Sequence, residues 1–319
     1  MSTNAKLLLL ILIQIVPLAG GWYLKKKGLA KESWGRPLSR FIICFFNTVI
    51  CFLAAWVLPR TVEMLMLPVV AVLFGAGVTL SGVGLARLHA RHTAPDRGAY
   101  IVASSISNYG FTLGGFVCLL FCQDGQKALS MQTIFIFPLV AYIYLLWFPI
   151  GRYYGTLQNN VTPLQSFLTA FRDITTLPLA GTLAGLAINF SGAAQPELFA
   201  PVKSVLVYIG TAASTFCIGV TLRPRSIGTY KRENASVSIT KFLVAPLLGY
   251  GLARLFGIDG TARQVTVILC SVPVGLFSSF AASLFGLNRD LTNSLFLVNT
   301  VLFLLVILPA LVLLLPYLA

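Results

Sequence analysis

The chain is a succession of apolar stretches of about 20 residues, separated by short polar gaps. A transmembrane helix needs about 20 mostly apolar residues to cross the hydrocarbon core of a bilayer. Of the 319 residues, 57% are hydrophobic and 10% are charged, whereas about 25% of a soluble domain is charged. A soluble fold of this length has too little interior to bury so much apolar surface. The sequence therefore predicts an all-α integral membrane protein and excludes soluble enzymes and nucleic-acid-binding proteins.

Ten stretches have the length and composition of membrane-spanning helices. They cover residues 5–24, 37–58, 63–86, 99–121, 130–150, 174–190, 200–222, 236–256, 263–284 and 291–317. No gap could hold a soluble domain, so we expect one transmembrane domain over residues 1–319. The largest gap, a linker at about 151–173, contains Thr162-Pro163 followed by apolar residues at helical spacing. This pattern predicts a short amphipathic helix on the cytoplasmic surface, with an ordinary linker as the alternative.

Basic residues are unevenly distributed among the gaps. Most of the 23 Lys and Arg lie in every second gap, starting with the first. Because cytoplasmic loops carry an excess of Lys and Arg, these gaps are predicted to be cytoplasmic and both termini to lie outside. The pattern fits a multi-pass protein of an inner or plasma membrane. The net charge of +14 then reflects topology and contacts with membrane lipids, and no nucleic-acid partner is expected.

A short motif occurs twice. Pro17-Leu18-Ala19-Gly20 returns as Pro178-Leu179-Ala180-Gly181, 161 residues later. An offset of this size places five predicted spans in each half, about 5–150 and about 174–317. Because five is odd, the second half would enter the membrane from the opposite side, which is the inverted repeat of many secondary transporters. The alternative is a chance echo between apolar segments.

Two predicted spans, 99–121 and 263–284, contain residues that interrupt a helix. The first holds several hydroxyls and glycines around Asn108, and the second holds Pro273 and Gly275. Glycine loosens a helix and proline removes a backbone donor. Non-helical backbone at membrane depth survives only inside protein or beside a water-filled cavity. Interrupted spans at matching positions of two halves therefore predict a transport site, although each alone could be a kink or a tight packing contact.

The chemistry of these breaks favours an anion. Each is expected to leave unpaired backbone N–H groups at the start of a half-helix, where partial positive charge collects. Asn108 can donate and accept hydrogen bonds there, and Asn47 is expected to reach the same cavity. Lys241 either extends to the cytoplasmic face or places a cation near the cavity. No Asp or Glu lies in the middle of a span, which disfavours ion coupling through carboxylates but leaves open sodium held by carbonyls and hydroxyls.

Signals of catalysis are weak. The pair His89 and His92 lies in a basic loop without a neighbouring acidic ligand, and the six cysteines lie in or beside apolar spans. We therefore expect no catalytic residue, no metal and no cofactor. A membrane enzyme and a channel remain the rival classes of function.

Four short motifs resemble the auxin efflux carrier family, and the resemblance spans essentially the whole chain. Asn108-Tyr109-Gly110-Phe111 is similar to the fourth-helix signature of that family. The run from Ser271 through Pro273 and Gly275 to Asp290 resembles its ninth-helix segment. Leu177–Gly181 and Ile218–Leu222 are similar to its sixth-helix start and seventh-helix end.

The resemblance implies ten helices in two inverted five-helix repeats, with broken helices four and nine crossing at mid-membrane at the substrate site. It also implies a scaffold that commonly forms a homodimer, an elevator-like or rocking motion, and organic anions as substrates. Two departures matter: Ser107 and Gly114-Gly115 stand where the family often has proline, and the long cytoplasmic loop of the plant hormone exporters is absent. Auxin itself is therefore a weak candidate.

The related bile acid:sodium symporter family shares this architecture and gives the alternative, a sodium-coupled transporter of organic anions. The predicted ninth span has no acidic residue at the place of that family's sodium site. Our prediction is a secondary transporter that moves a small carboxylate by alternating access. The expected binding residues are Ser105, Ser107, Asn108, Gly110 and Phe111 at the first break, Pro273, Val274, Gly275 and Ser278 at the second, and Asn47.

Overall fold

The computed structural model describes residues 3–58, 65–88, 93–110, 113–155, 162–223 and 228–318. Within these ranges every regular element is helical. Seven continuous helices in this part of the chain are long and apolar enough to cross a membrane. They span Glu32–Trp56, Met66–Leu88, Lys127–Gly155, Ile174–Ser191, Phe199–Thr221, Lys231–Leu255 and Arg289–Leu318. The chain is thus an all-helical integral membrane protein.

Several of these long helices contain a π-helical turn, labelled η2, η4, η8 and η9 below. In chain order the elements are α1 (Thr3–Lys26), η1 (Glu32–Trp34), α2 (Gly35–Phe41), η2 (Ile42–Asn47), α3 (Thr48–Trp56), α4 (Met66–Leu88), α5 (Ala94–Ser105), α6 (Gly114–Phe121), α7 (Gly125–Tyr142), η4 (Ile143–Trp147), α8 (Phe148–Gly155), α9 (Pro163–Ala170), η6 (Ile174–Thr176), α10 (Leu177–Ser191), α11 (Phe199–Thr221), α12 (Lys231–Ile239), η8 (Thr240–Val244), α13 (Ala245–Leu255), α14 (Gly260–Ser271), α15 (Leu276–Phe285), α16 (Arg289–Leu302), η9 (Phe303–Ile307), α17 (Leu308–Leu314) and η10 (Leu315–Leu318).

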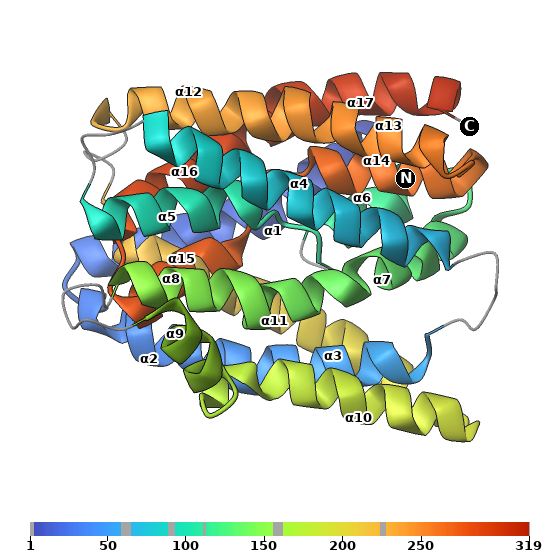
Figure 1. Ribbon diagram of the computed structural model, residues 1–319, viewed down its shortest axis with the longest axis horizontal. Helices are drawn as coiled ribbons and strands as arrows, with labels where there is room; N and C mark the ends of the chain where they lie inside the picture. The colour runs from blue at the N-terminus through green and yellow to red at the C-terminus, as the bar shows by residue number, and fades with distance from the viewer. Residues whose placement is uncertain are drawn as a thin grey trace.

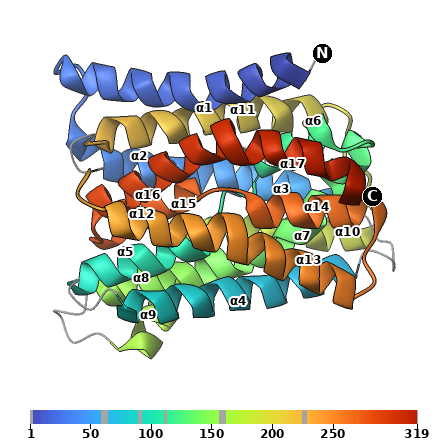
Figure 2. The same cartoon turned by 90° about the horizontal axis from the view of Figure 1, so that it is seen from above.

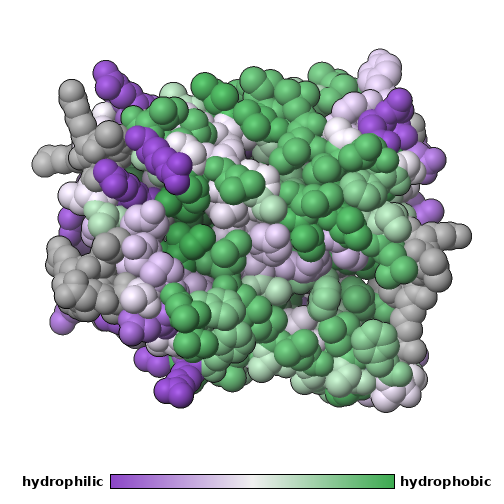
Figure 3. All heavy atoms as spheres, in the orientation of Figure 1, coloured by the Kyte–Doolittle hydropathy of each residue, from purple (hydrophilic) through white to green (hydrophobic). Residues whose placement is uncertain are grey.

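The long helices run roughly parallel and form one bundle (Figure 1). Helices α5, α6, α14 and α15 consist mostly of buried residues, and α1 lies along one side of the bundle (Figure 2). Hydrophobic residues form a broad band between two more hydrophilic ends, as expected for a bilayer-spanning surface (Figure 3). We call the end that carries Lys25, Arg36, Arg223 and Arg289 the basic end. Both chain ends lie at the opposite end of the bundle.

Two helix pairs pack backbone against backbone. Helix α1 packs on α11, and α10 packs on α3. A Cβ atom built on Gly219 would lie 2.0 Å from the Leu18 carbonyl oxygen, and one on Gly185 would lie 2.3 Å from the Phe52 carbonyl oxygen. Only glycine permits such an approach, and small residues at close helix contacts are typical of membrane bundles.

The short helix expected in the linker is α9. Thr162 caps it, because the Thr162 hydroxyl accepts a hydrogen bond from the Gln165 amide at 3.2 Å and the Gln165 side chain accepts one from the Thr162 amide at 3.0 Å. This reciprocal arrangement satisfies two donors that a helix start leaves open. Helix α9 runs across the direction of the long helices rather than along it (Figure 1).

Candidate functional site

Both spans that were expected to break are interrupted in the structure. Helix α5 ends at Ser105, and Ile106 is extended with φ −82° and ψ 121°. The Ser105 hydroxyl donates to the Ile101 carbonyl at 2.8 Å, and such back-bonding weakens a helix end. Helix α14 ends at Ser271 with Val272 extended, because the residue before a proline is driven out of the helical region.

The two breaks are joined to each other by their backbones. Ser107 and Val274 form an isolated antiparallel bridge. The Asn108 amide donates to the Pro273 carbonyl at 2.9 Å, and the Gly275 amide donates to the Ile106 carbonyl at 3.0 Å. These bonds satisfy polar backbone groups that lipid could not satisfy. We call this contact the crossing.

Glycine at position 275 is what allows the crossing to form. A Cβ atom there would lie 2.6 Å from the Ser107 carbonyl oxygen, well inside van der Waals contact. Gly275 also forms the N-cap of α15, in an extended conformation. The residue therefore serves the contact between the breaks as well as the start of the second half-helix.

Helix α6, the half-helix that follows the first break, does not start with the unpaired N–H groups that we expected. The Gly114 amide donates to the Asn108 carbonyl at 3.0 Å, and the Gly115 amide donates to the Gly110 carbonyl at 2.9 Å. From α7, the Gln132 side-chain amide donates to the Tyr109 carbonyl at 2.9 Å. The expectation was therefore wrong for Gly114 and Gly115, because the loop before α6 folds back and supplies its own acceptors.

A cavity of about 110 Å³ lies beside the crossing. A single buried water needs about 10–15 Å³ on this measure, so the cavity has room for a small ligand. Its walls are mainly apolar, with a few amide and hydroxyl groups. They consist of Asn47, Ile50, Cys51, Ser107, Asn108, Tyr109, Gly110, Ile136, Leu139, Val140, Ile143, Tyr144, Val207, Gly210, Thr211, Ser214, Leu276, Phe277 and Phe280.

A lysine reaches the crossing from another helix. The Lys241 ammonium group donates to the Ser107 hydroxyl at 2.5 Å, and only 1% of the Lys241 side chain is exposed. The sequence left open whether the Lys241 side chain extends to the cytoplasmic face or lies near the cavity, and in the structure it is buried near the cavity. Within the part of the chain that the structure describes, no carboxylate forms an ion pair with Lys241. Ser107 thus contacts the Lys241 amino group on one side and lines the cavity on the other.

The membrane transport protein family matches residues 6–311, which is nearly the whole chain. The chain belongs to that family. Its resemblance to auxin efflux carriers is thereby confirmed, since these carriers make up the family. A protein of Methanothermobacter thermautotrophicus named an uncharacterized transporter is 26% identical over 313 residues, covering 94% of each chain.

Four of the expected binding residues of this family member line the cavity: Asn47, Ser107, Asn108 and Gly110. Asn47 is half-buried, and its side chain has no hydrogen-bond partner among the described residues. The side-chain amide of Asn47 is therefore available to bind a ligand.

The other expected residues have different surroundings. Pro273, Val274 and Gly275 build the crossing and do not line the cavity. The hydroxyls of Ser105 and Ser278 donate to carbonyls of their own segments, Ile101 at 2.8 Å and Gly275 at 2.7 Å. Phe111 lies outside the described residues.

Sequence reasoning missed Thr211 and Ser214, which α11 presents to the cavity. Their hydroxyls donate to Val207 at 2.7 Å and Gly210 at 2.6 Å, and the oxygen lone pairs stay available to the cavity. The signal was a run of small residues from Gly210 to Thr215 in the middle of a span. Asn47 and Lys241 both lie in π-helical turns, η2 and η8, which occur often at functional sites.

No Asp or Glu lines the cavity in the described ranges. The same ranges contain no group of three or more His, Cys, Asp or Glu side chains that could hold a metal ion. His89 and His92 lie outside them. The polar chemistry of the cavity is thus that of amides, hydroxyls and one ammonium group behind Ser107.

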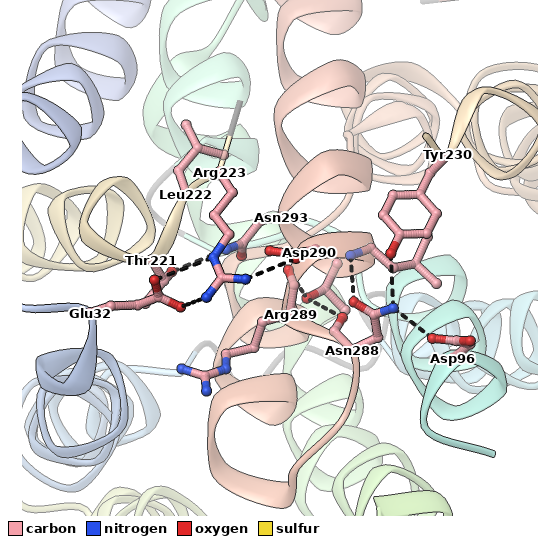
Figure 4. A network of polar contacts seen from close by, with 12 residues as sticks. Glu32, Asp96, Thr221, Leu222, Arg223, Tyr230, Asn288, Arg289, Asp290 and Asn293 are labelled. Carbon is pink, nitrogen blue, oxygen red and sulfur yellow. Dashed lines mark hydrogen bonds and ion pairs between the residues drawn. The ribbon is translucent and has the colours of Figure 1, made fainter. Parts of the chain in front are cut away.

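A network of charged and polar side chains lies at the basic end of the bundle (Figure 4). Arg223, which follows α11, pairs with Glu32 at 2.8 Å and with Asp290 of α16 at 3.4 Å. Beside it, the Asn288 side chain donates to Asp96 at 2.6 Å and to the Tyr230 hydroxyl at 3.0 Å. The network links η1 and α11 on one side with α5 and α16 on the other.

Proposed function

We propose that the protein is a secondary transporter that binds a small organic anion, a carboxylate, in the cavity beside the crossing. The observation that carries the proposal is the buried Lys241 ammonium at 2.5 Å from the Ser107 hydroxyl. In a medium of low dielectric constant, a positive charge attracts an anion far more strongly than in water. No described carboxylate lines the cavity, so no negative charge of the protein there offsets that attraction.

The walls of the cavity supply donors that fit a carboxylate. Asn47 brings a side-chain amide from the π-helical turn η2, and Asn108 brings one from the first break. Leu276 and Phe277, in the first turn of α15, also line the cavity. The remaining wall is apolar, including Tyr144 and Phe280. A ligand with one charged end and a short apolar body suits this division.

Alternating access between two groups of helices is supported by where the cavity lies. One wall comes from η2, α3 and α11, and the other from the crossing, α7, η4 and α15. The first group contains the tightly packed pairs α1–α11 and α3–α10. Movement of the crossing against these pairs would open the cavity first to one side of the membrane and then to the other.

Ten helices in two inverted repeats fit the element bounds. Helices α2, α4, α5 and α7 begin about 164 to 166 residues before the helices that match them in order, namely α11, α12, α14 and α16. The π-helical turns η4 and η9 are about 160 residues apart. The reciprocal pairs α1–α11 and α3–α10 are the contacts that a two-fold relation between the halves would generate.

Coupling to sodium is disfavoured by the same lysine. Sodium would need carbonyl and hydroxyl oxygens near the crossing, and the Lys241 ammonium already binds the Ser107 hydroxyl. A second cation beside it would face strong repulsion in a low-dielectric interior. We therefore propose sodium-independent transport, with both termini outside as the basic loops indicate.

Thermal stabilisation of the purified protein by a panel of small mono- and dicarboxylates, with and without sodium, tests this function. A ligand at about 100 times its Kd stabilises the folded state by about 2.7 kcal/mol. We expect stabilisation without sodium, which Lys241→Gln removes and Lys127→Gln retains. Lys127 is exposed, so the second variant makes the same charge change away from the site.

Stabilisation that requires sodium would support the symporter alternative. A carboxylate that stabilises Lys241→Gln as much as the wild type would contradict the role of the ammonium group. If no carboxylate has any effect, the substrate class proposed here is wrong.

A further inference from the structure

A second, separate pocket of about 540 Å³ opens at the basic end of the bundle. Its walls come from α2, α8, the stretch from the end of α9 through η6, and the end of α15. The lining residues are Arg36, Arg40, Arg152, Thr169, Asp173, Thr175, Leu284, Phe285 and Gly286. None of them lines the cavity at the crossing.

The pocket carries an excess of two positive charges. Asp173 forms an ion pair with Arg152, and the Arg152 guanidinium also lies 5.1 Å from the centre of the Phe285 ring. Burial raises the pKa of Asp173, but hydrogen bonds from Thr175 and the Arg152 guanidinium outweigh it, so the pKa lies below its ordinary value. Arg36 and Arg40 are exposed and have no ion pair with any described carboxylate. Their charge is therefore available to a ligand.

Exposed apolar side chains, which we call the apolar border, lie on or next to two of the elements that form the pocket, α9 and α2. Helix α9 exposes Leu164 and Leu168, Phe171 follows it, and the Leu164 side chain is 65% exposed. Phe41 and Phe45, next to Arg40, are exposed as well, and their rings stack at 5.6 Å. A helix that lies across the bundle with an apolar face outward is typical of the membrane interface. The pocket therefore opens at the depth of the lipid headgroups.

We propose that this pocket binds the phosphate headgroup of an acidic membrane phospholipid. Arg36 and Arg40 bind the phosphate through charge-assisted, forked hydrogen bonds. The acyl chains lie along Phe41, Phe45 and the outward face of α9. Basic pockets between membrane helices are known to take such headgroups. A soluble phosphate would use the same arginines, but it would leave the apolar border without a role.

Native mass spectrometry of the full chain in detergent tests the proposal, with added phosphatidylglycerol or phosphatidylcholine. We expect the wild type to retain phosphatidylglycerol in preference to phosphatidylcholine. Replacing both arginines, Arg36→Gln with Arg40→Gln, is expected to weaken retention by about fivefold for each arginine. The matched control is Lys231→Gln with Arg232→Gln, an equal charge change at the start of α12, which is expected to keep the preference.

The pair Arg36→Lys and Arg40→Lys keeps the charge and loses the forked geometry, so it should retain the lipid at an intermediate level. A melting curve shows whether the glutamine pair folds. If it does not fold, the lysine pair still tests the proposal. Equal retention of phosphatidylglycerol by wild type and glutamine pair overturns the proposal. Displacement of the lipid by inorganic phosphate at millimolar concentration would also overturn it, by identifying a site for a soluble anion.

Discussion

Lys241 places an ammonium group in a part of the molecule that a bilayer would otherwise keep free of charge. Its neighbour at hydrogen-bond distance is the Ser107 hydroxyl, a much weaker partner than a carboxylate. Buried ionisable groups in membrane helices are costly and mark substrate or ion pathways. The free protein carries this cost in free energy, and the anion that we propose as substrate would reduce it.

Replacing this lysine should separate stability from function. Lys241→Met removes a buried charge while filling similar volume, and burying an ammonium group without a carboxylate partner costs free energy. We expect a melting temperature equal to or above that of the wild type, together with loss of carboxylate binding. A variant that melts much lower would mean that the lysine is part of the structural core.

Asn108 and Ser105 allow a matched comparison between two residues from the same break. Asn108 lines the cavity, whereas the Ser105 hydroxyl bonds its own helix. Because a hydrogen bond to a charged group contributes about 1.5–3 kcal/mol, Asn108→Ala should reduce carboxylate transport by about tenfold or more. Its backbone bonds at the crossing are unchanged, so folding should be preserved. Uptake into proteoliposomes measures the effect, and Ser105→Ala should transport like the wild type.

At the scale of elements, the crossing depends on the closeness of two backbones. Gly275→Ala introduces a Cβ atom 2.6 Å from the Ser107 carbonyl oxygen. Overpacking of this kind costs about 1–3 kcal/mol, and it should push the breaks apart and impair transport. Gly251→Ala is the control, because nothing lies within 4 Å of a Cβ atom there. In that exposed helical position alanine should stabilise by up to about 1 kcal/mol, which paired melting and uptake assays can check.

The sequence was sufficient to predict the helix breaks but not their partners. Pro273, Gly275 and the serines before Asn108 act on their own backbone, so their effect can be predicted from the local sequence. Ser105 and Ser278 were expected to bind substrate because a sequence does not tell which hydroxyls bond back to their own segment. Thr211, Ser214 and the direction of Lys241 depend on how α11 and η8 are rotated against the crossing, which is decided by packing between distant helices.

At the scale of the whole molecule, the Arg223 network fastens two groups of helices at the basic end. It links Glu32, before α2, with Asp290 in α16 (Figure 4). The Arg223 side chain is 55% exposed, and exposed ion pairs contribute about 0–1 kcal/mol. The network is therefore too weak to hold the fold, but a free energy of this size would shift the balance between the two open states that we propose.

Arg223→Gln should consequently change access to the cavity more than stability. Cys51 is a free cysteine that lines the cavity, so its alkylation rate by a thiol reagent, read by peptide mass spectrometry, reports opening. We expect severalfold faster labelling of Cys51 in Arg223→Gln, and in the wild type at high salt, where such pairs are screened. Arg232→Gln, an exposed position without a contact to this network, serves as the control. Unchanged labelling of Cys51 would show that the network is not a gate.

The crossing also constrains how the protein is made. Ile106 and Asn108 bond to Gly275 and Pro273, residues that leave the ribosome more than 160 positions later. Until then, the non-helical segment after α5 has no backbone partner from the second break, although lipid cannot satisfy its polar groups. Water or the insertion machinery must therefore bind the polar backbone groups of the first break during synthesis. The first half of the chain completes its folding only after the second half has been inserted.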